Sequence, residues 1–110
     1  MRLDDFVAAE PLTRLDFIKL DIEGWEVRCL AGAQETLRRF RPAVLLEVRA
    51  DTLARAGNAP EEVWEIFETL RYRCFAAPEH ENYRLTPVEP GAPLYGDYLF
   101  VPEERAFDPV

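Results

Sequence analysis

Charged side chains collect around the ends of two apolar runs in the sequence. The first run carries Lys19 and Asp21 and is followed directly by Glu23, and the second carries Glu47 near its end. Carboxylates packed together raise the pKa of at least one member, whereas a neighbouring ammonium lowers it. A carboxylate tuned in this way can take a proton from a hydroxyl or an amine. These residues therefore indicate general-base chemistry, provided that the fold brings them together.

The same residues allow two other interpretations. Lys19 could be only the counter-ion of Asp21 or Glu47, in which case the charges would simply hold the edge of a sheet together. Alternatively, Asp21, Glu23 and Glu47 could be oxygen ligands of a metal-assisted enzyme. The spacing of these residues does not decide among the three interpretations.

Aromatic residues and one histidine are weaker candidates. Trp25 follows the turn after the first run and could line a substrate pocket, although an aromatic residue that starts a helix often packs in a core. His80, the only histidine, lies in an acidic loop and could shuttle protons, but a lone loop histidine is usually inert. Tyr83, Tyr95 and Tyr98 could flank a substrate or merely hold a proline-rich loop in place.

Hydrophobic periodicity predicts the elements that would position the carboxylates. Residues 17–22 and 43–48 predict strands, and the second is apolar until Glu47, which is typical of a strand covered on both faces. Apolar residues three or four apart predict an amphipathic helix over residues 25–40, with a break near Gly32. Two strands joined through a helix must run parallel.

The rest of the chain continues this alternation. A short helical piece and a helix that begins at Pro60 are expected next, because proline and the acidic residues after it suit a helix start. Residues 72–76 predict a third strand and residues 98–101 a final one. The proline-rich loop between them, residues 78–96, is too irregular for a helix, so these two strands are expected to pair antiparallel. It could hold a further short strand at residues 83–85.

This element order, β-α-β-α-β-β, predicts an α/β layered sheet in a single domain over residues 1–110. In open α/β sheets, ligands bind outside the carboxyl ends of the strands. Asp21, Glu23 and Glu47 would lie at that edge.

Composition excludes several classes of protein. The 13 basic and 21 acidic side chains give a net charge of −8, which argues against nucleic-acid and anionic-membrane partners. No apolar run approaches the roughly 20 residues that span a bilayer, and the first residues lack the apolar stretch of a signal peptide. We therefore expect a cytoplasmic protein.

Cys29 and Cys74 form neither a CxxC pair nor a disulfide framework and are expected to be small buried residues. The five glycines do not form GxGxxG after a strand.

A longer pattern surrounds the carboxylates. It consists of Ile18-Lys19-Leu20-Asp21-Ile22-Glu23-Gly24-Trp25-Glu26, Leu30-Ala31-Gly32-Ala33, Thr36-Leu37, Pro42 and Leu45-Leu46-Glu47-Val48, together with the opening Leu3-Asp4-Asp5-Phe6. The pattern resembles the FkbM-type methyltransferases, whose signature reads I-K-hydrophobe-D-hydrophobe-E-G. The resemblance covers residues 2–56, and the remainder fits only in outline.

The resemblance implies a Rossmann-like fold that uses S-adenosylmethionine. It implies that Asp21 and Glu23 follow the fourth strand of the full fold, beside cofactor and acceptor, where a carboxylate would take the proton of an acceptor hydroxyl. Glu47 would end the fifth strand, and we expect Glu47 and Trp25 to contact the acceptor, a small molecule or a sugar.

The family's glycine-rich first strand and ribose-binding acid precede the matching region, whereas only a short segment precedes it here. We therefore expect the chain to be the carboxyl-terminal half of the domain, without the half that binds the cofactor. By itself it is then expected to bind S-adenosylmethionine negligibly.

A non-catalytic half-sheet module is the alternative function. An unpaired first strand exposes backbone N–H and C=O groups that can pair with another chain. This alternative predicts a homodimer, or a complex with another protein, formed through that edge strand.

Overall fold

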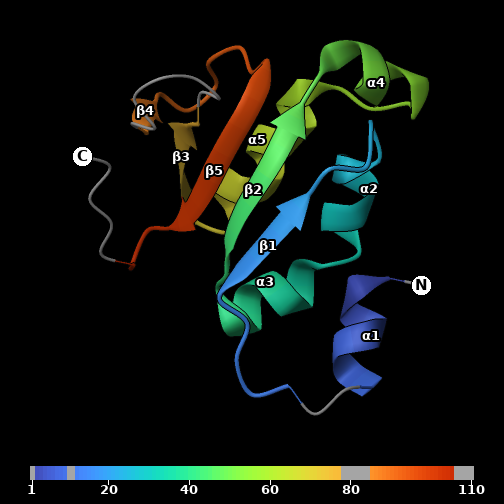
Figure 1. Ribbon diagram of the computed structural model, residues 1–110, viewed down its shortest axis with the longest axis vertical. Helices are drawn as coiled ribbons and strands as arrows, with labels where there is room; N and C mark the ends of the chain where they lie inside the picture. Colours follow the sequence, from blue (N-terminus) through green and yellow to red (C-terminus); the bar gives the residue numbers. More distant parts are fainter. Residues whose placement is uncertain (1, 10–11, 78–84, 106–110) are drawn as a thin grey trace.

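A computed structural model describes residues 2–9, 12–77 and 85–105. The elements alternate along the chain (Figure 1). Two of them, α1 at the start of the chain and β4 just ahead of the last strand, were not predicted from the sequence in these places. In order they are α1 (Leu3–Ala9), β1 (Phe17–Leu20), α2 (Glu26–Ala31), α3 (Gln34–Phe40), β2 (Ala43–Val48), α4 (Ala50–Arg55), α5 (Pro60–Thr69), β3 (Tyr72–Ala76), β4 (Thr86–Val88) and β5 (Gly96–Pro102).

The strands form one mixed sheet in the order β1-β2-β5-β3-β4. β1 and β2 are parallel, as expected for strands joined through helices. β5 lies between β2 and β3 and is antiparallel to both, which confirms the expected antiparallel pairing of the strands at 72–76 and 98–101. β4 pairs with β3 just beyond residues 83–85, of which only Leu85 is described. The α/β class is confirmed, in an open sheet with β1 at one edge.

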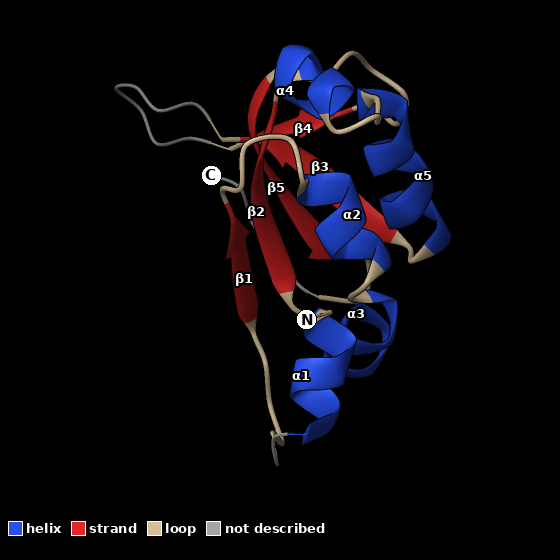
Figure 2. Cartoon of the chain, turned by 90° about the vertical axis from the view of Figure 1, so that its right-hand side faces the viewer, coloured by secondary structure: helices blue, strands red, loops and turns tan. Residues whose placement is uncertain are grey.

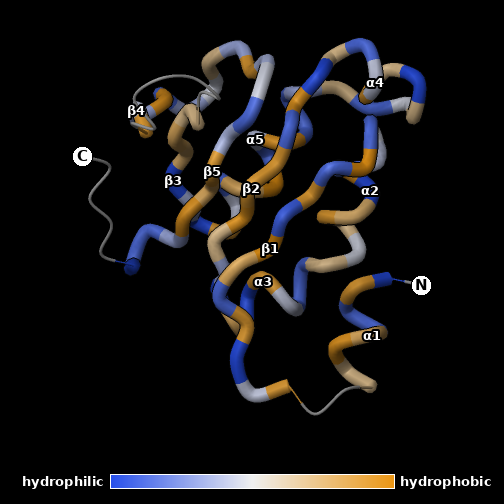
Figure 3. Tube along the Cα trace, viewed as in Figure 1, coloured by the Kyte–Doolittle hydropathy of each residue, from blue (hydrophilic) through white to orange (hydrophobic). Residues whose placement is uncertain are grey.

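The helices of the described residues lie on one face of the sheet (Figure 2). Alternate residues of β2 point toward them, and Val44, Leu46 and Val48 are buried to 1% exposure or less. Figure 3 shows this apolar stretch at the centre of the sheet. Leu45 and Glu47 point the other way and are only half-buried. The expectation that β2 is covered on both faces is therefore wrong for the described residues.

Aromatic stacking joins the helical layer to the centre of the sheet. Phe67 of α5 stacks on Phe100 of β5 with ring centroids 4.0 Å apart, and Trp64 meets the same ring edge-on. Both phenylalanines are fully buried. Burial of rings of this size contributes more to folding than most single residues, so the contact of α5 with β5 contributes strongly to the stability of the core.

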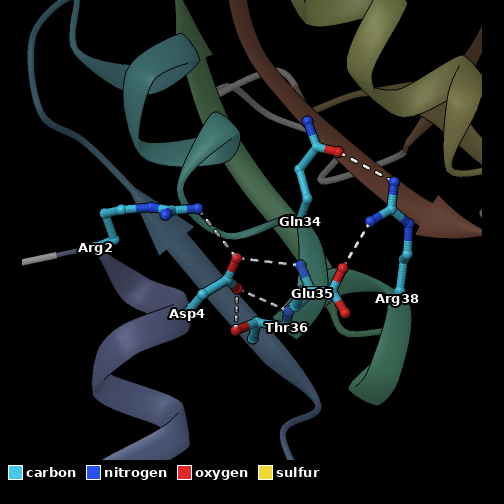
Figure 4. A network of polar contacts seen from close by, with 6 residues as sticks. All are labelled: Arg2, Asp4, Gln34, Glu35, Thr36 and Arg38. Atoms are coloured by element: carbon cyan, nitrogen blue, oxygen red, sulfur yellow. Dashed lines mark hydrogen bonds and ion pairs between the residues drawn. The ribbon is translucent and has the colours of Figure 1, made fainter.

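The expected break near Gly32 divides the predicted long helix into α2 and α3. The unpredicted helix α1 docks at this break, where the backbone N–H of Asp4 donates to the carbonyl of Gly32 at 2.9 Å. The Asp4 carboxylate also accepts hydrogen bonds from the backbone N–H groups of Glu35 and Thr36, the first turn of α3 (Figure 4). These bonds satisfy N–H groups that have no partner within their own helix.

Both cysteines are free thiols. Cys74 of β3 is buried, as expected, and Cys29 of α2 is half-buried. Burial raises the pKa of both thiols, that of Cys74 to about 12. Neither sulfur is therefore a ready nucleophile. Within the described part of the chain, no helix is long and apolar enough to cross a membrane.

Candidate functional site

The loop after β1 forms a tight, left-handed turn. β1 ends at Leu20, two residues earlier than the apolar run suggested, and the chain turns at Glu23 (φ 45°) and Gly24 (φ 100°). A Cβ atom on Gly24 would overlap the backbone carbonyl of Thr52 in α4. Only glycine therefore allows this loop to pack against the loop and helix that follow β2.

Glu26 holds the same loop from within. Its side chain is 2% exposed, and its two carboxylate oxygens accept the backbone N–H of Ile22 at 3.1 Å and that of Gly24 at 2.8 Å. Glu26 is not among the site residues that the sequence pattern indicated. An acidic residue in the first turn of a helix is a common pattern, and nothing in that pattern distinguishes a buried carboxylate from a solvated one.

A cavity of about 150 Å³ lies at the carboxyl ends of β1 and β2. It is lined by Lys19, Leu20, Asp21, Leu45, Leu46, Glu47 and Asp97. Three of the four charged residues expected at this edge are thus brought together, and Asp97 of β5 joins them because its register partner is Glu47. Among the described residues no ion pair within 4.0 Å links Lys19 to Asp21 or Glu47, so the counter-ion interpretation lacks its contact.

A second cavity, of about 200 Å³, is lined by Glu23, Glu26, Glu47, Arg49, Asp51 and Thr52. Glu47 lines both cavities, whereas Asp21 and Glu23 line different ones. The two carboxylates expected at the end of the first strand, Asp21 and Glu23, therefore do not share a cavity, because β1 ends at Leu20 and the turn redirects Glu23. In the described ranges, no three His, Cys, Asp or Glu side chains are grouped so that they could hold a metal ion. The metal-ligand interpretation is therefore not supported.

Arg49 connects Glu47 to the segment that enters β5. Its Nη1 donates to Glu47 Oε1 at 3.4 Å, and its Nη2 donates to the hydroxyl of Tyr95 at 3.2 Å. Asp51 lies 3.9 Å from the guanidinium Nε. Tyr95 and then Glu47 raise the pKa of Arg49, so its charge persists at any working pH.

The remaining candidates lie elsewhere. Trp25 precedes α2, is 52% exposed and lines neither cavity; the guanidinium of Arg28 lies 4.9 Å from its ring centroid. Tyr98 is nearly buried and bonds through its hydroxyl to the backbone of Tyr95. His80 and Tyr83 lie outside the described residues.

A family model described as the methyltransferase FkbM domain matches residues 1–74. The chain belongs to the FkbM methyltransferase family. The matched residues carry every charged group of the two cavities except Asp97. Searches of curated proteins and of solved structures found no match to this FkbM-family chain.

Membership in the FkbM family implies S-adenosylmethionine as the methyl donor. Ligand pockets for molecules of that size span roughly 300–1,000 Å³, and each of the two cavities is smaller. Carboxylates outnumber basic side chains in both cavities, and no glycine-rich loop is among the residues that line them. These residues fit the hydroxyl groups of an acceptor, and they do not fit the whole cofactor.

Proposed function

We propose that this chain supplies the acceptor side of an S-adenosylmethionine-dependent O-methyltransferase. The acceptor is a small molecule with a hydroxyl group, bound at the carboxyl ends of β1 and β2. The supporting observation is that Asp21 shares a cavity with Lys19 and Glu47 at the end of a parallel strand pair, in a chain of the FkbM family. Ligands of open α/β sheets bind at that edge.

Asp21 is the proposed general base. It is exposed, so an acceptor hydroxyl can reach it and lose its proton to the carboxylate as the oxygen is methylated. Glu47 and Lys19 accept and donate hydrogen bonds to the remaining hydroxyl groups and orient the acceptor. S-adenosylmethionine would supply the methyl group. Alignment of the reactants and removal of the proton are the contributions that protein residues can make to such a displacement.

Glu23 is the second candidate base. It lines the other cavity, beyond the shared wall of Glu47, so only one of the two carboxylates can face a given acceptor hydroxyl. We place the reacting hydroxyl at Asp21, because Lys19 in the same cavity can hold a neighbouring oxygen of the acceptor. Carboxylates outnumber basic groups in both cavities, which favours a neutral or cationic acceptor over a phosphorylated or carboxylated one.

A split-enzyme experiment tests this function. The chain is joined to the cofactor-binding half of a characterised FkbM methyltransferase and incubated with isotopically labelled S-adenosylmethionine and a mixture of sugars, hydroxy acids and phenols. We expect a labelled O-methyl product, which Asp21→Asn reduces by about 10²–10⁴-fold, the range of general-base catalysis. Glu65→Gln, on the exposed face of α5, is the control. A label on nitrogen or carbon, or full activity in Asp21→Asn, would contradict the proposal.

One observation favours the second function, an interaction module. Among the strands of the described residues, β1 pairs only with β2, and Phe17 on this edge strand is 52% exposed. Such an edge can extend the sheet into a second copy of the chain. Size-exclusion chromatography with light scattering tests this function, because a monomer at high concentration would exclude self-association through β1.

A further inference from the structure

Tyr95 is at once the most exposed large aromatic residue in the described part of the chain and a tightly held one. Tyr95 is 65% exposed. Its backbone N–H donates to the hydroxyl of Tyr98 at 2.9 Å, and its own hydroxyl accepts from Arg49 at 3.2 Å. An exposed tyrosine without such bonds changes rotamer on a picosecond to nanosecond timescale, so these contacts restrict a ring that solvent alone would leave free.

The segment that carries Tyr95 is itself anchored to the core. Leu94 is 4% exposed, and the indole Nε1–H of Trp64 donates to the carbonyl of Ala92 at 2.8 Å. Gly96 then starts β5 opposite Val48, the last residue of β2. Figure 1 shows this segment beside the carboxyl end of β2. Tyr95 itself lines neither cavity, but its ring has a fixed position two residues before Asp97, which lines the proposed acceptor site.

One guanidinium separates Tyr95 from Glu47. Arg49 bonds to both side chains, and its Cζ lies 5.5 Å from the centroid of the Tyr95 ring. Arg49 thus covers part of the ring and leaves the rest open to solvent. A rigid aromatic surface that is already ordered binds an apolar ring face with little entropic cost.

We propose that Tyr95 is an acceptor-contact residue whose exposed ring packs against a ring of the acceptor, so that the acceptor is a cyclic, hydroxyl-bearing molecule. This inference rests on the proposed function. Tyr95 lies outside the family-matched residues 1–74 and would form an additional wall of the acceptor site. Contact with this wall would favour cyclic acceptors over linear ones. Arg49 acts as a positioning residue, since it holds the Tyr95 hydroxyl and the Glu47 carboxylate at the same time.

Binding of simple probes to the 110-residue chain tests the inference without any cofactor. Phenol and methyl β-glucoside are the cyclic probes and glycerol is the linear one, each titrated against protein with isotopically labelled tyrosine and phenylalanine rings and followed by NMR. We expect the cyclic probes to shift the Tyr95 ring signals and glycerol to leave them unchanged. Tyr95→Ala should weaken binding at least about fivefold, the range of a ring-on-ring contact.

Two further variants sharpen the result. Phe6→Ala removes another exposed aromatic, in α1, and should leave binding unchanged. Tyr95→Phe keeps the ring and loses the bond to Arg49, so we expect only about a twofold loss. The inference is overturned if no cyclic probe binds, if Tyr95→Ala binds like the wild type, if Tyr95→Phe is as weak as Tyr95→Ala, or if the Phe6 ring shifts as much as the Tyr95 ring.

The two proposals can fail separately. If cyclic probes bind at Tyr95 while Asp21→Asn leaves methyl transfer intact, the wall stands and the assignment of the base is wrong. If Asp21→Asn abolishes transfer and no probe binds at Tyr95, the proposed function stands and the inference about the acceptor ring is wrong.

Discussion

Asp4 and Thr36 are joined by two hydrogen bonds that tie helix α1 to the start of helix α3. One carboxylate oxygen of Asp4 accepts the backbone N–H of Thr36 at 2.8 Å and its hydroxyl at 2.7 Å. The other oxygen accepts the N–H of Glu35 at 3.2 Å (Figure 4). A residue from one helix thus caps the amino-terminal turn of another, because α3 begins at Gln34 after Ala33, which has no side-chain acceptor.

Removal of this cap should destabilise the fold. We expect Asp4→Ala to lower the free energy of unfolding by about 1–2 kcal/mol, the usual cost of a lost helix cap. Asp5→Ala, one residue further along α1 and exposed, is the matched control and should cost less than about 0.5 kcal/mol. Urea unfolding of both variants makes the comparison. Equal losses would show that Asp4 does not act as the cap.

The stability that the Asp4 carboxylate contributes should depend on pH. Burial alone would raise the pKa of Asp4, but the hydrogen bonds from Thr36 and Glu35 outweigh it, and the pKa falls below its ordinary value of 3.8. The cap therefore contributes fully above pH 3.8 and is lost as the pH falls through the lower folded-state pKa. The difference in unfolding free energy between wild type and Asp4→Asn should narrow in that acid range. A difference that stays constant with pH would contradict this assignment.

Glu26→Gln tests the buried support of the site loop. A glutamine offers one carbonyl oxygen to the two N–H donors of Ile22 and Gly24, so one donor is left unpaired inside the protein. We expect a loss of about 1–3 kcal/mol in unfolding free energy and faster hydrogen exchange at these two amides. Glu35→Gln, in the first turn of α3 with a 78% exposed side chain, is the control. Unchanged exchange at Gly24 would refute the role of Glu26.

Gly24→Ala tests the contact between the two loops. The new Cβ would clash with the backbone of Thr52, so the loop must move away from α4. Alanine is also strained by the left-handed backbone conformation of residue 24, whose φ is +100°. We expect a loss of about 2 kcal/mol or more. Gly91→Ala has a similar φ of +84° with open space around it, and should cost only about 1 kcal/mol. Calorimetric unfolding of the two variants separates the effect of the clash from the effect of the left-handed backbone. Equal losses of unfolding free energy in Gly24→Ala and Gly91→Ala would exclude the clash with Thr52.

The buried hydroxyl of Tyr72 leads us to expect that the protein loses stability at alkaline pH. Its hydroxyl donates to the carbonyl of Pro42 at 2.7 Å, and burial raises its pKa from 10.0 to about 12. Because the folded state favours the neutral phenol, this contribution is full below pH 10 and is lost as the pH rises through about 12. Tyr72→Phe should cost about 1 kcal/mol at neutral pH and flatten this alkaline decline. Denaturant unfolding at several pH values measures both, and a decline of unchanged slope in Tyr72→Phe would exclude Tyr72 as its source.

Calorimetry with S-adenosylmethionine checks the fit of the cofactor. We expect no measurable binding to the 110-residue chain, because neither cavity can enclose a ligand of that size. A micromolar dissociation constant would contradict this expectation and would mean that these residues hold the cofactor by themselves.

Local patterns in the sequence determined most of the elements and the family. Apolar runs predicted β1, β2, β3 and β5, the spacing of Val27, Leu30 and Leu37 predicted a helical face that is buried, and Gly32 marked the break within it. These features depend on neighbours a few residues away, so periodicity reports them. The Lys-Leu-Asp-Ile-Glu-Gly signature was likewise enough to indicate the FkbM family, which the family model confirms.

Only the tertiary structure decided which charged residues share a cavity. β5 inserts between β2 and β3, which sets Asp97 beside Glu47 and brings Tyr95 to Arg49. Strand order depends on pairing between segments that are distant in the sequence, so local periodicity gives no information about it. The separation of Glu23 from Asp21 and the burial of Glu26 depend in the same way on how one loop packs against α4. Sequence therefore identified the type of site, and long-range packing selected the residues that form its walls.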